Sequence, residues 1–95
     1  MEHYNLKIKG NFNNEKFEEE ILKAIDIISS RNGIETSEFN LIEYNPSKGL
    51  NKDKGQFKIY KIKKNKITFG FLECFKSDDN SLIIIYTSPT NSKYF

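Results

Sequence analysis

Hydrophobic residues change from a strand period to a helical period in the first third of the chain. Between residues 4 and 9 every second position is apolar and Gly10 follows, a pattern typical of a strand with one buried face. After a turn at 11–14, apolar residues recur three and four positions apart. These are Phe17, Ile21, Ala24, Ile25 and Ile28, flanked by Leu22. We predict an amphipathic helix of about five turns. It begins at Asn13 or Asn14 and ends at a left-handed cap supplied by Asn32-Gly33.

Strands are predicted for the rest of the chain. One runs from about Glu38 to Tyr44, with Phe39, Leu41 and Glu43 on one face and Ile42 and Tyr44 on the other. Residues 57–63 and 67–75 form the clearest hairpin. A Lys64-Asn65 turn would pair Ile62 with Ile67, Tyr60 with Phe69 and Lys58 with Phe71. The continuously apolar run 82–86 is typical of a central strand.

This order of elements, β-α-β-β-β-β, predicts an α+β fold with two layers. One amphipathic helix packs on a mainly antiparallel sheet of four to five strands. The chain is a single domain over 1–95, with a mobile basic loop at about 45–56 and a C-terminal tail at about 88–95.

One helix covers only one face of such a sheet, and the predicted hairpin leaves apolar residues on the other. They are Phe57, Ile59, Leu72 and Cys74, a candidate exposed patch. Either the loop and the aromatic tail with Tyr94 and Phe95 cover this patch, or a partner or a second copy does.

Charge divides the chain into two unlike parts. Residues 1–47 carry a net charge of −4 and residues 48–95 a net charge of +6. Eight lysines, the basic block, fall within residues 48–66: Lys48, Lys52, Lys54, Lys58, Lys61, Lys63, Lys64 and Lys66. Such asymmetry points to a binding partner. The abundance of Lys, Asn and Ile is also typical of an AT-rich genome, that of a low-GC bacterium or phage, in which many lysines are ordinary solvated residues.

Catalytic and metal-binding patterns are not found. His3 is the one histidine and Cys74 the one cysteine, which excludes a Cys/His zinc site. We interpret Cys74 as a buried structural residue. Asp78-Asp79-Asn80 is better explained as a turn than as a cation site. Gly49 and Gly55 flank lysines without the spacing of a phosphate-binding loop. We therefore expect no enzyme, no cofactor and no metal.

A lone cysteine, and the absence of a signal peptide or of a long apolar run, lead us to expect a cytoplasmic protein without membrane contact. The leading hypothesis is a small non-catalytic protein that docks on another protein, such as a toxin or nuclease, and modulates it as an inhibitor, antitoxin or immunity-type protein. Its contact surface is either the basic block or the acidic start of the helix, at Glu15, Glu18 and Glu19.

Two alternatives remain. In the first, the basic block binds single-stranded nucleic acid, with lysines on phosphates and aromatic residues on bases. Against it, Phe57 and Tyr60 would point to opposite faces of a strand, as would Lys58 and Lys61. In the second, the protein associates with itself through an open sheet face, so it is a monomer or a homodimer.

Overall fold

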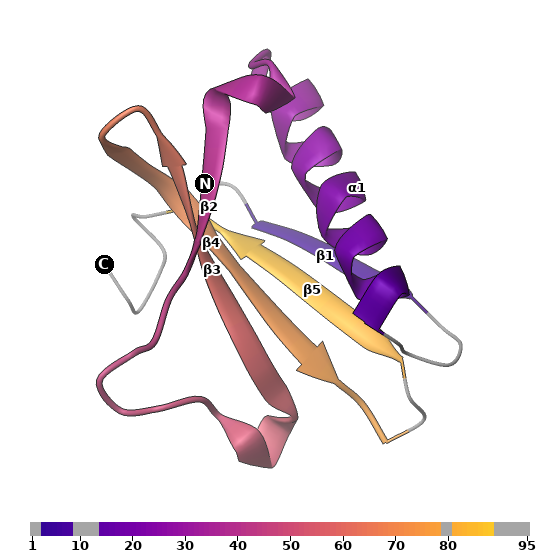
Figure 1. Ribbon diagram of the computed structural model, residues 1–95. Coiled ribbons are helices and arrows are strands. Elements are labelled where there is room, and N and C mark those ends of the chain that lie inside the picture. Colours follow the sequence, from indigo (N-terminus) through magenta and orange to yellow (C-terminus); the bar gives the residue numbers. More distant parts are fainter. Residues whose placement is uncertain (1–2, 9–13, 79–80, 89–95) are drawn as a thin grey trace.

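In the described part of the chain, one α-helix packs on one face of a five-stranded antiparallel sheet (Figure 1). The computed structural model describes residues 3–8, 14–78 and 81–88, with side chains from residue 17 onward. Its main elements are β1 (His3–Ile8), α1 (Asn14–Asn32), β2 (Phe39–Glu43), β3 (Gln56–Lys64), β4 (Ile67–Lys76) and β5 (Leu82–Thr87). Two short 3-10 helices, η1 (Thr36–Glu38) and η2 (Lys52–Lys54), precede β2 and β3. The predicted α+β fold and the order of its elements are confirmed.

The sheet has the strand order β1-β5-β4-β3-β2. The helix therefore carries the chain from the edge formed by β1 to the opposite edge, formed by β2 (Figure 1). From β2 the strands return side by side as an antiparallel meander, until β5 pairs with β1. The central position predicted for residues 82–86 is confirmed, because β5 lies between β1 and β4.

The end of α1 follows the predicted cap. Gly33 has a φ of 64°, a left-handed conformation that glycine adopts without steric cost. Its N–H bonds to the carbonyl of Ser30, and the N–H of Ile34 bonds to the carbonyl of Ser29. This pair of bonds is a Schellman motif. Ile34 then packs against the core, so the cap also sets the direction in which the chain leaves the helix.

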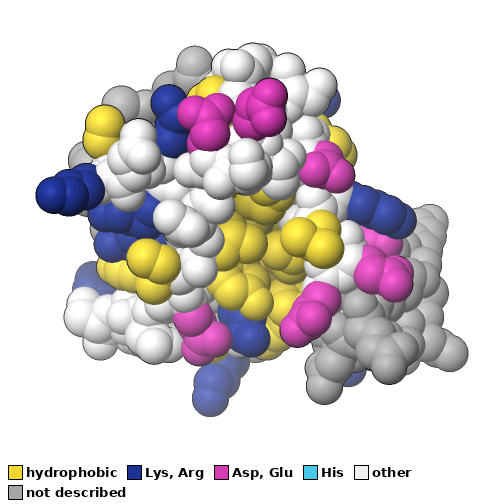
Figure 2. All heavy atoms as spheres, turned by 45° about the horizontal axis from the view of Figure 1, so that its top comes forward, with side chains coloured by type: hydrophobic (Ala, Val, Ile, Leu, Met, Phe, Trp, Pro, Cys, Tyr) yellow, Lys and Arg dark blue, Asp and Glu magenta, His cyan; other side chains and the backbone are white. Residues whose placement is uncertain are grey.

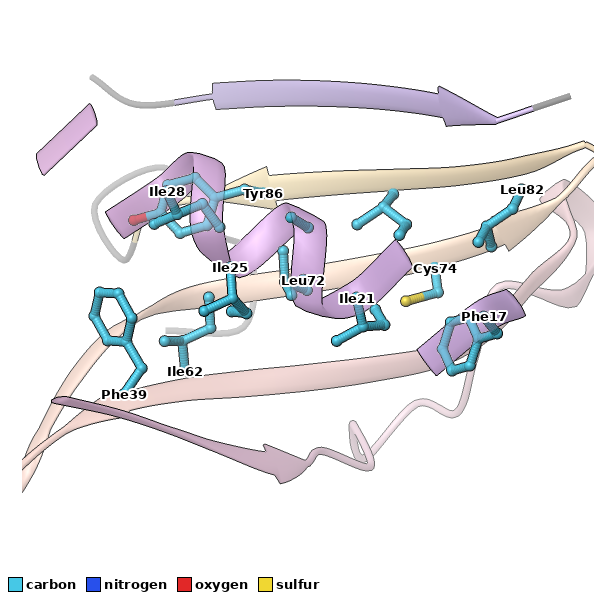
Figure 3. Close-up of a cluster of buried hydrophobic side chains, with 12 residues drawn as sticks. Phe17, Ile21, Ile25, Ile28, Phe39, Ile62, Leu72, Cys74, Leu82 and Tyr86 are labelled. Atoms are coloured by element: carbon cyan, nitrogen blue, oxygen red, sulfur yellow. The ribbon is translucent and has the colours of Figure 1, made fainter. Parts of the chain in front are cut away.

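The hydrophobic core lies between α1 and the sheet (Figure 3). The helix contributes the side chains of its predicted apolar stripe, each no more than 6% exposed. The sheet contributes Phe39 from β2, Ile62 from β3, Leu72 and Cys74 from β4, and Leu82, Ile84 and Tyr86 from β5. The predicted faces of β2 are also confirmed, because Phe39 is buried in this core and Leu41 packs against it.

The predicted register of the β3–β4 hairpin is wrong. The turn lies at Asn65-Lys66, because Lys64 pairs with Ile67 and Asn65 takes the positive φ of 58°. An irregularity at Phe69 then shifts the pairing again, so that Ile62 opposes Gly70. Further along, Tyr60 opposes Leu72 and Lys58 opposes Cys74.

This register also corrects the predicted apolar patch. Leu72 and Cys74 belong to the core beneath the helix, and Phe57 packs against that core. A second register shift, between Gln56 and Lys58, turns Phe57 toward the helix. The rings of Phe57 and Tyr60 therefore both contact Phe17, with centroid distances of 5.3 and 6.3 Å, and do not point to opposite faces as predicted.

On the face away from the helix, Ile59 and Phe71 are nevertheless buried, at 0% and 1% exposure. Tyr44 was predicted to end the strand but is the first residue after β2, and its ring packs edge-on against Phe71 at 5.4 Å. The loop thus contributes to covering this face. The tail residues 89–95, including Tyr94 and Phe95, lie outside the described residues, as do Asp79 and Asn80 of the predicted turn.

Candidate functional site: an acidic apolar groove and a dispersed basic block

The basic block does not form one surface. Alternation along β3 sends Lys58 and Lys64 to the helix side and Lys61 and Lys63 to the opposite face. The prediction that Lys58 and Lys61 point to opposite faces is confirmed. The remaining members are exposed on the loop, at Lys48, Lys52 and Lys54, and in the hairpin turn, at Lys66.

Both helix-side lysines are engaged by carboxylates. The Nζ of Lys58 lies 3.5 Å from Glu43 and that of Lys64 lies 3.9 Å from Glu38. Lys58 also lies 5.6 Å from the ring centroid of Tyr60. Burial alone would lower the pKa of Lys58, but Tyr60 and Glu43 outweigh burial and raise it. Lys58 therefore stays charged at neutral pH.

Lys61 lies over aromatic rings on the opposite face. Its Nζ is 5.2 Å from the ring centroid of Tyr44 and 6.0 Å from that of Phe71, distances typical of cation–π contacts. Lys63 follows two residues later on the same face. The side chain of Tyr44 is half-buried, whereas that of Phe71 is fully buried.

The acidic residues of the helix behave differently from one another. Glu18 and Glu19 are exposed, as predicted, whereas the side chain of Glu15 lies outside the described ones. Glu20 is buried at 8% exposure and accepts a hydrogen bond from the Nζ of Lys23 at 3.1 Å. Among the described side chains at the start of α1, the outward carboxylates are those of Glu18 and Glu19.

A groove of about 220 Å³ separates α1 from the edge strand β2. It is lined by Glu18, Ile21, Leu22, Leu41 and Tyr60. Leu22 is 60% exposed and, with Ile42 and Ile67, is one of the exposed large hydrophobic side chains of the described residues. Figure 2 shows hydrophobic side chains gathered at the centre of this face, with acidic side chains around them.

The acidic border of the groove follows from helix geometry. Residues four apart share one stripe of a helix, so Glu18 and Asp26 stand on either side of Leu22. Asp26 accepts a hydrogen bond from the hydroxyl of Thr36 at 3.1 Å, which places it at the η1 end of the groove. Glu43 and Glu38 lie at the two ends of β2. The sequence signal for this groove was Leu22, which falls outside the buried stripe.

A second hollow, of about 610 Å³, lies beneath the loop between β2 and β3. It is lined by Tyr44, Pro46, Ser47, Lys48, Gly49, Leu50, Asn51 and Gln56. Gln56, 3% exposed, anchors one end of the loop. Its Oε1 accepts a hydrogen bond from the N–H of Asn51 at 2.8 Å, and its Nε2 donates one to Glu73 at 2.7 Å.

The described residues offer neither a reactive cysteine nor a cluster of metal-ligating side chains. Cys74 is fully buried, as predicted, and burial raises the pKa of its thiol to about 12, so the reactive thiolate is scarce at neutral pH. Within the described part of the chain, no three Cys, His, Asp or Glu side chains gather as metal ligands would. The side chain of His3 lies outside the described ones.

None of the helices in the described ranges has the length and apolarity needed to cross a membrane.

Comparison with protein-family models, with curated protein sequences and with solved structures gave no match.

Proposed function

We propose that this chain is a small non-catalytic protein that docks on another protein through the groove between α1 and β2. The observation that carries the proposal is Leu22, a large apolar side chain exposed beside the half-buried Leu41 and Tyr60 and bordered by acids. Clustered apolar side chains with a polar rim are the usual anatomy of a protein interface.

Charge favours the groove over the basic block as the contact surface. The two lysines that approach the groove from β3 lie next to Glu43 and Glu38, which leaves Glu18 and Glu19 to set a negative local field. A basic partner, such as the nucleic-acid-binding surface of a nuclease, would be attracted to this field and oriented by it. Blocking such a surface inhibits the partner without any chemistry by the inhibitor, as expected of an antitoxin or immunity-type protein.

The test is affinity capture from a lysate of the native cells with three matched baits. Leu22→Glu places a charge in the groove, whereas Ile67→Glu makes the same kind of change at a 71% exposed position in the hairpin. We expect a stoichiometric protein bound by the wild type and by Ile67→Glu, with its recovery reduced at least tenfold by Leu22→Glu. Equal recovery with Leu22→Glu would refute the groove as the docking surface.

Nucleic-acid binding is a second candidate, favoured by the placement of Lys61 and Lys63 on one face beside Tyr44. Lysines of this kind would release counterions on binding, so affinity for single-stranded RNA or DNA would fall steeply with salt. The variant Lys61→Glu with Lys63→Glu would abolish that binding. If the same pair leaves nucleic-acid binding intact, or if none is measurable at 50 mM salt, this candidate is excluded.

A further inference from the structure

The open edge of β2 offers backbone hydrogen-bonding groups directly beside the groove. Among the described residues, β2 pairs only with β3, so its other edge faces outward. The N–H of Tyr44 donates to the carbonyl of Ile59 at 2.8 Å, which shows that the peptide groups of Tyr44 point toward β3.

Alternation along an antiparallel strand then assigns the other peptide groups. Ile42 and Asn40, two and four residues before Tyr44, also point toward β3. The N–H and C=O groups of Leu41 and Glu43 therefore point to the outer edge. The peptide groups of Phe39 also point to the outer edge, but its N–H already donates a hydrogen bond to the carbonyl of Thr36 in η1. The available positions on this edge are thus Leu41 and Glu43.

Apolar side chains flank this edge on both faces of the sheet. Leu41 points into the groove beside Leu22 on the helix side. Ile42, 51% exposed, stands on the opposite face. A strand added to β2 would place successive side chains on alternate faces, so one residue would fill the groove and its neighbour would cover Ile42. A helix lying in the groove would cover Leu22 and Leu41 but leave Ile42, on the opposite face of the sheet, exposed.

We infer that the partner contributes an extended basic and apolar segment that adds a strand to β2. This inference rests on the proposed docking at the groove and names the form of the partner. Charge complementarity specifies the ends of the segment: one basic residue faces Glu18, and a second faces Asp26 at the η1 end of the groove. Apolar residues lie between them, opposite Leu41 and Ile42.

An antiparallel segment of this kind reads Lys-Val-Leu-Thr-Lys, with its leucine opposite Leu41 and its valine opposite Ile42, so that both lysines point to the helix side of the sheet. We would titrate this peptide, blocked at both ends and at up to millimolar concentration, into the full-length protein and follow it by NMR. Two readouts separate the two proposals. Shifts of the Leu22 and Leu41 methyl signals report occupation of the groove. Slowed hydrogen exchange at the amides of Leu41 and Glu43 reports strand pairing.

We expect both readouts, with exchange at these two amides slowed at least tenfold. The same peptide carrying an N-methyl group on its leucine, which removes the N–H directed at Leu41, should lose both. If the methyl signals shift while the amides of Leu41 and Glu43 exchange as before, the strand inference is wrong and the groove proposal stands. If no methyl signal moves at millimolar peptide, both are contradicted for a partner of this chemistry.

A pair of variants of the protein also tests whether the peptide pairs with β2 as a strand. Glu43→Pro removes an outward N–H at an edge position that tolerates proline, and Glu43→Ala keeps that N–H while losing the same carboxylate. We expect about tenfold weaker peptide binding by the proline variant than by the alanine variant. Equal binding would overturn the inference. Slow hydrogen exchange at the amides of Leu41 and Glu43 in the absence of peptide, together with a dimer in light scattering, would identify a second copy of the chain as the occupant. That result would also overturn the inference.

Discussion

The phenol of Tyr86 donates a hydrogen bond to the backbone carbonyl of Phe69 at 3.0 Å, and its ring lies directly over Gly70. A Cβ atom at Gly70 would come within 2.3 Å of Tyr86 Cε1 and 2.8 Å of the carbonyl oxygen of Thr87. The bulge at Phe69, the glycine and the tyrosine therefore form one unit in which the ring occupies the space of the missing side chain.

This unit predicts strong coupling between Gly70 and Tyr86. Gly70→Ala should lower the free energy of unfolding by roughly 1–3 kcal/mol, because the new methyl overlaps a buried ring. Tyr86→Phe should cost about 1 kcal/mol through the lost hydrogen bond. Urea denaturation of both variants measures these changes.

The control is a double-mutant cycle with Tyr86→Leu, which removes the ring. In that background Gly70→Ala should cost less than in the wild type. An unchanged cost would mean that the carbonyl of Thr87, rather than the ring, limits the space at Gly70.

Gln56 should hold the loop between β2 and β3 against the sheet. Gln56→Ala leaves the Asn51 N–H without its acceptor and removes the bond to Glu73, at a cost of roughly 1–3 kcal/mol. We expect faster tryptic cleavage after Lys48, Lys52 and Lys54 in this variant. Ser47→Ala, an exposed change on the same loop, should leave cleavage unaltered. If the two variants are cleaved at the same rate, Gln56 does not anchor the loop.

Cys74 predicts a decline of stability in alkaline solution. Its folded pKa of about 12 exceeds the value of 9.0 for a free thiol, because burial disfavours the thiolate. Between about pH 9 and about pH 12 the unfolded chain has lost this proton and the folded chain has kept it. The free energy of unfolding therefore falls as pH rises through this window, by at most about 1.4 kcal/mol per pH unit.

Cys74→Ala should remove that part of the slope, which denaturant titrations at several pH values can measure. Below pH 8, the wild-type thiol should resist a disulfide reagent until urea unfolds the chain. Rapid modification of the native protein, or identical slopes for both proteins, would contradict the burial of Cys74.

Leu22→Glu should leave the fold intact. Leu22 is mostly exposed, and surface changes of this kind usually alter stability by about 0.5 kcal/mol or less. Ile28→Ala, at a position 1% exposed in the core, should instead cost roughly 2–5 kcal/mol. Thermal denaturation distinguishes the two. If Leu22→Glu unfolds the protein, its loss of binding could not be assigned to the groove.

The helix and the location of the strands were readable from local patterns. The stripe from Phe17 to Ile28 has a helical period, and Gly33 supplies a cap that depends on its own backbone freedom. The alternation in residues 39–44 likewise predicted the two faces of β2, because side-chain direction in a strand depends only on position.

The register of the hairpin required the tertiary structure. A shift of one residue reverses which face a side chain occupies, and the bulge at Phe69 arises where Tyr86, from the neighbouring strand β5, packs over Gly70. For this reason the predicted patch at Leu72 and Cys74 was wrong. The sequence by itself determined the helix, the fold class and the segregation of charge along the chain. Only the tertiary structure decided which lysines share a face and that Leu22, Leu41 and Tyr60 meet in one groove, because these contacts join residues far apart in the chain.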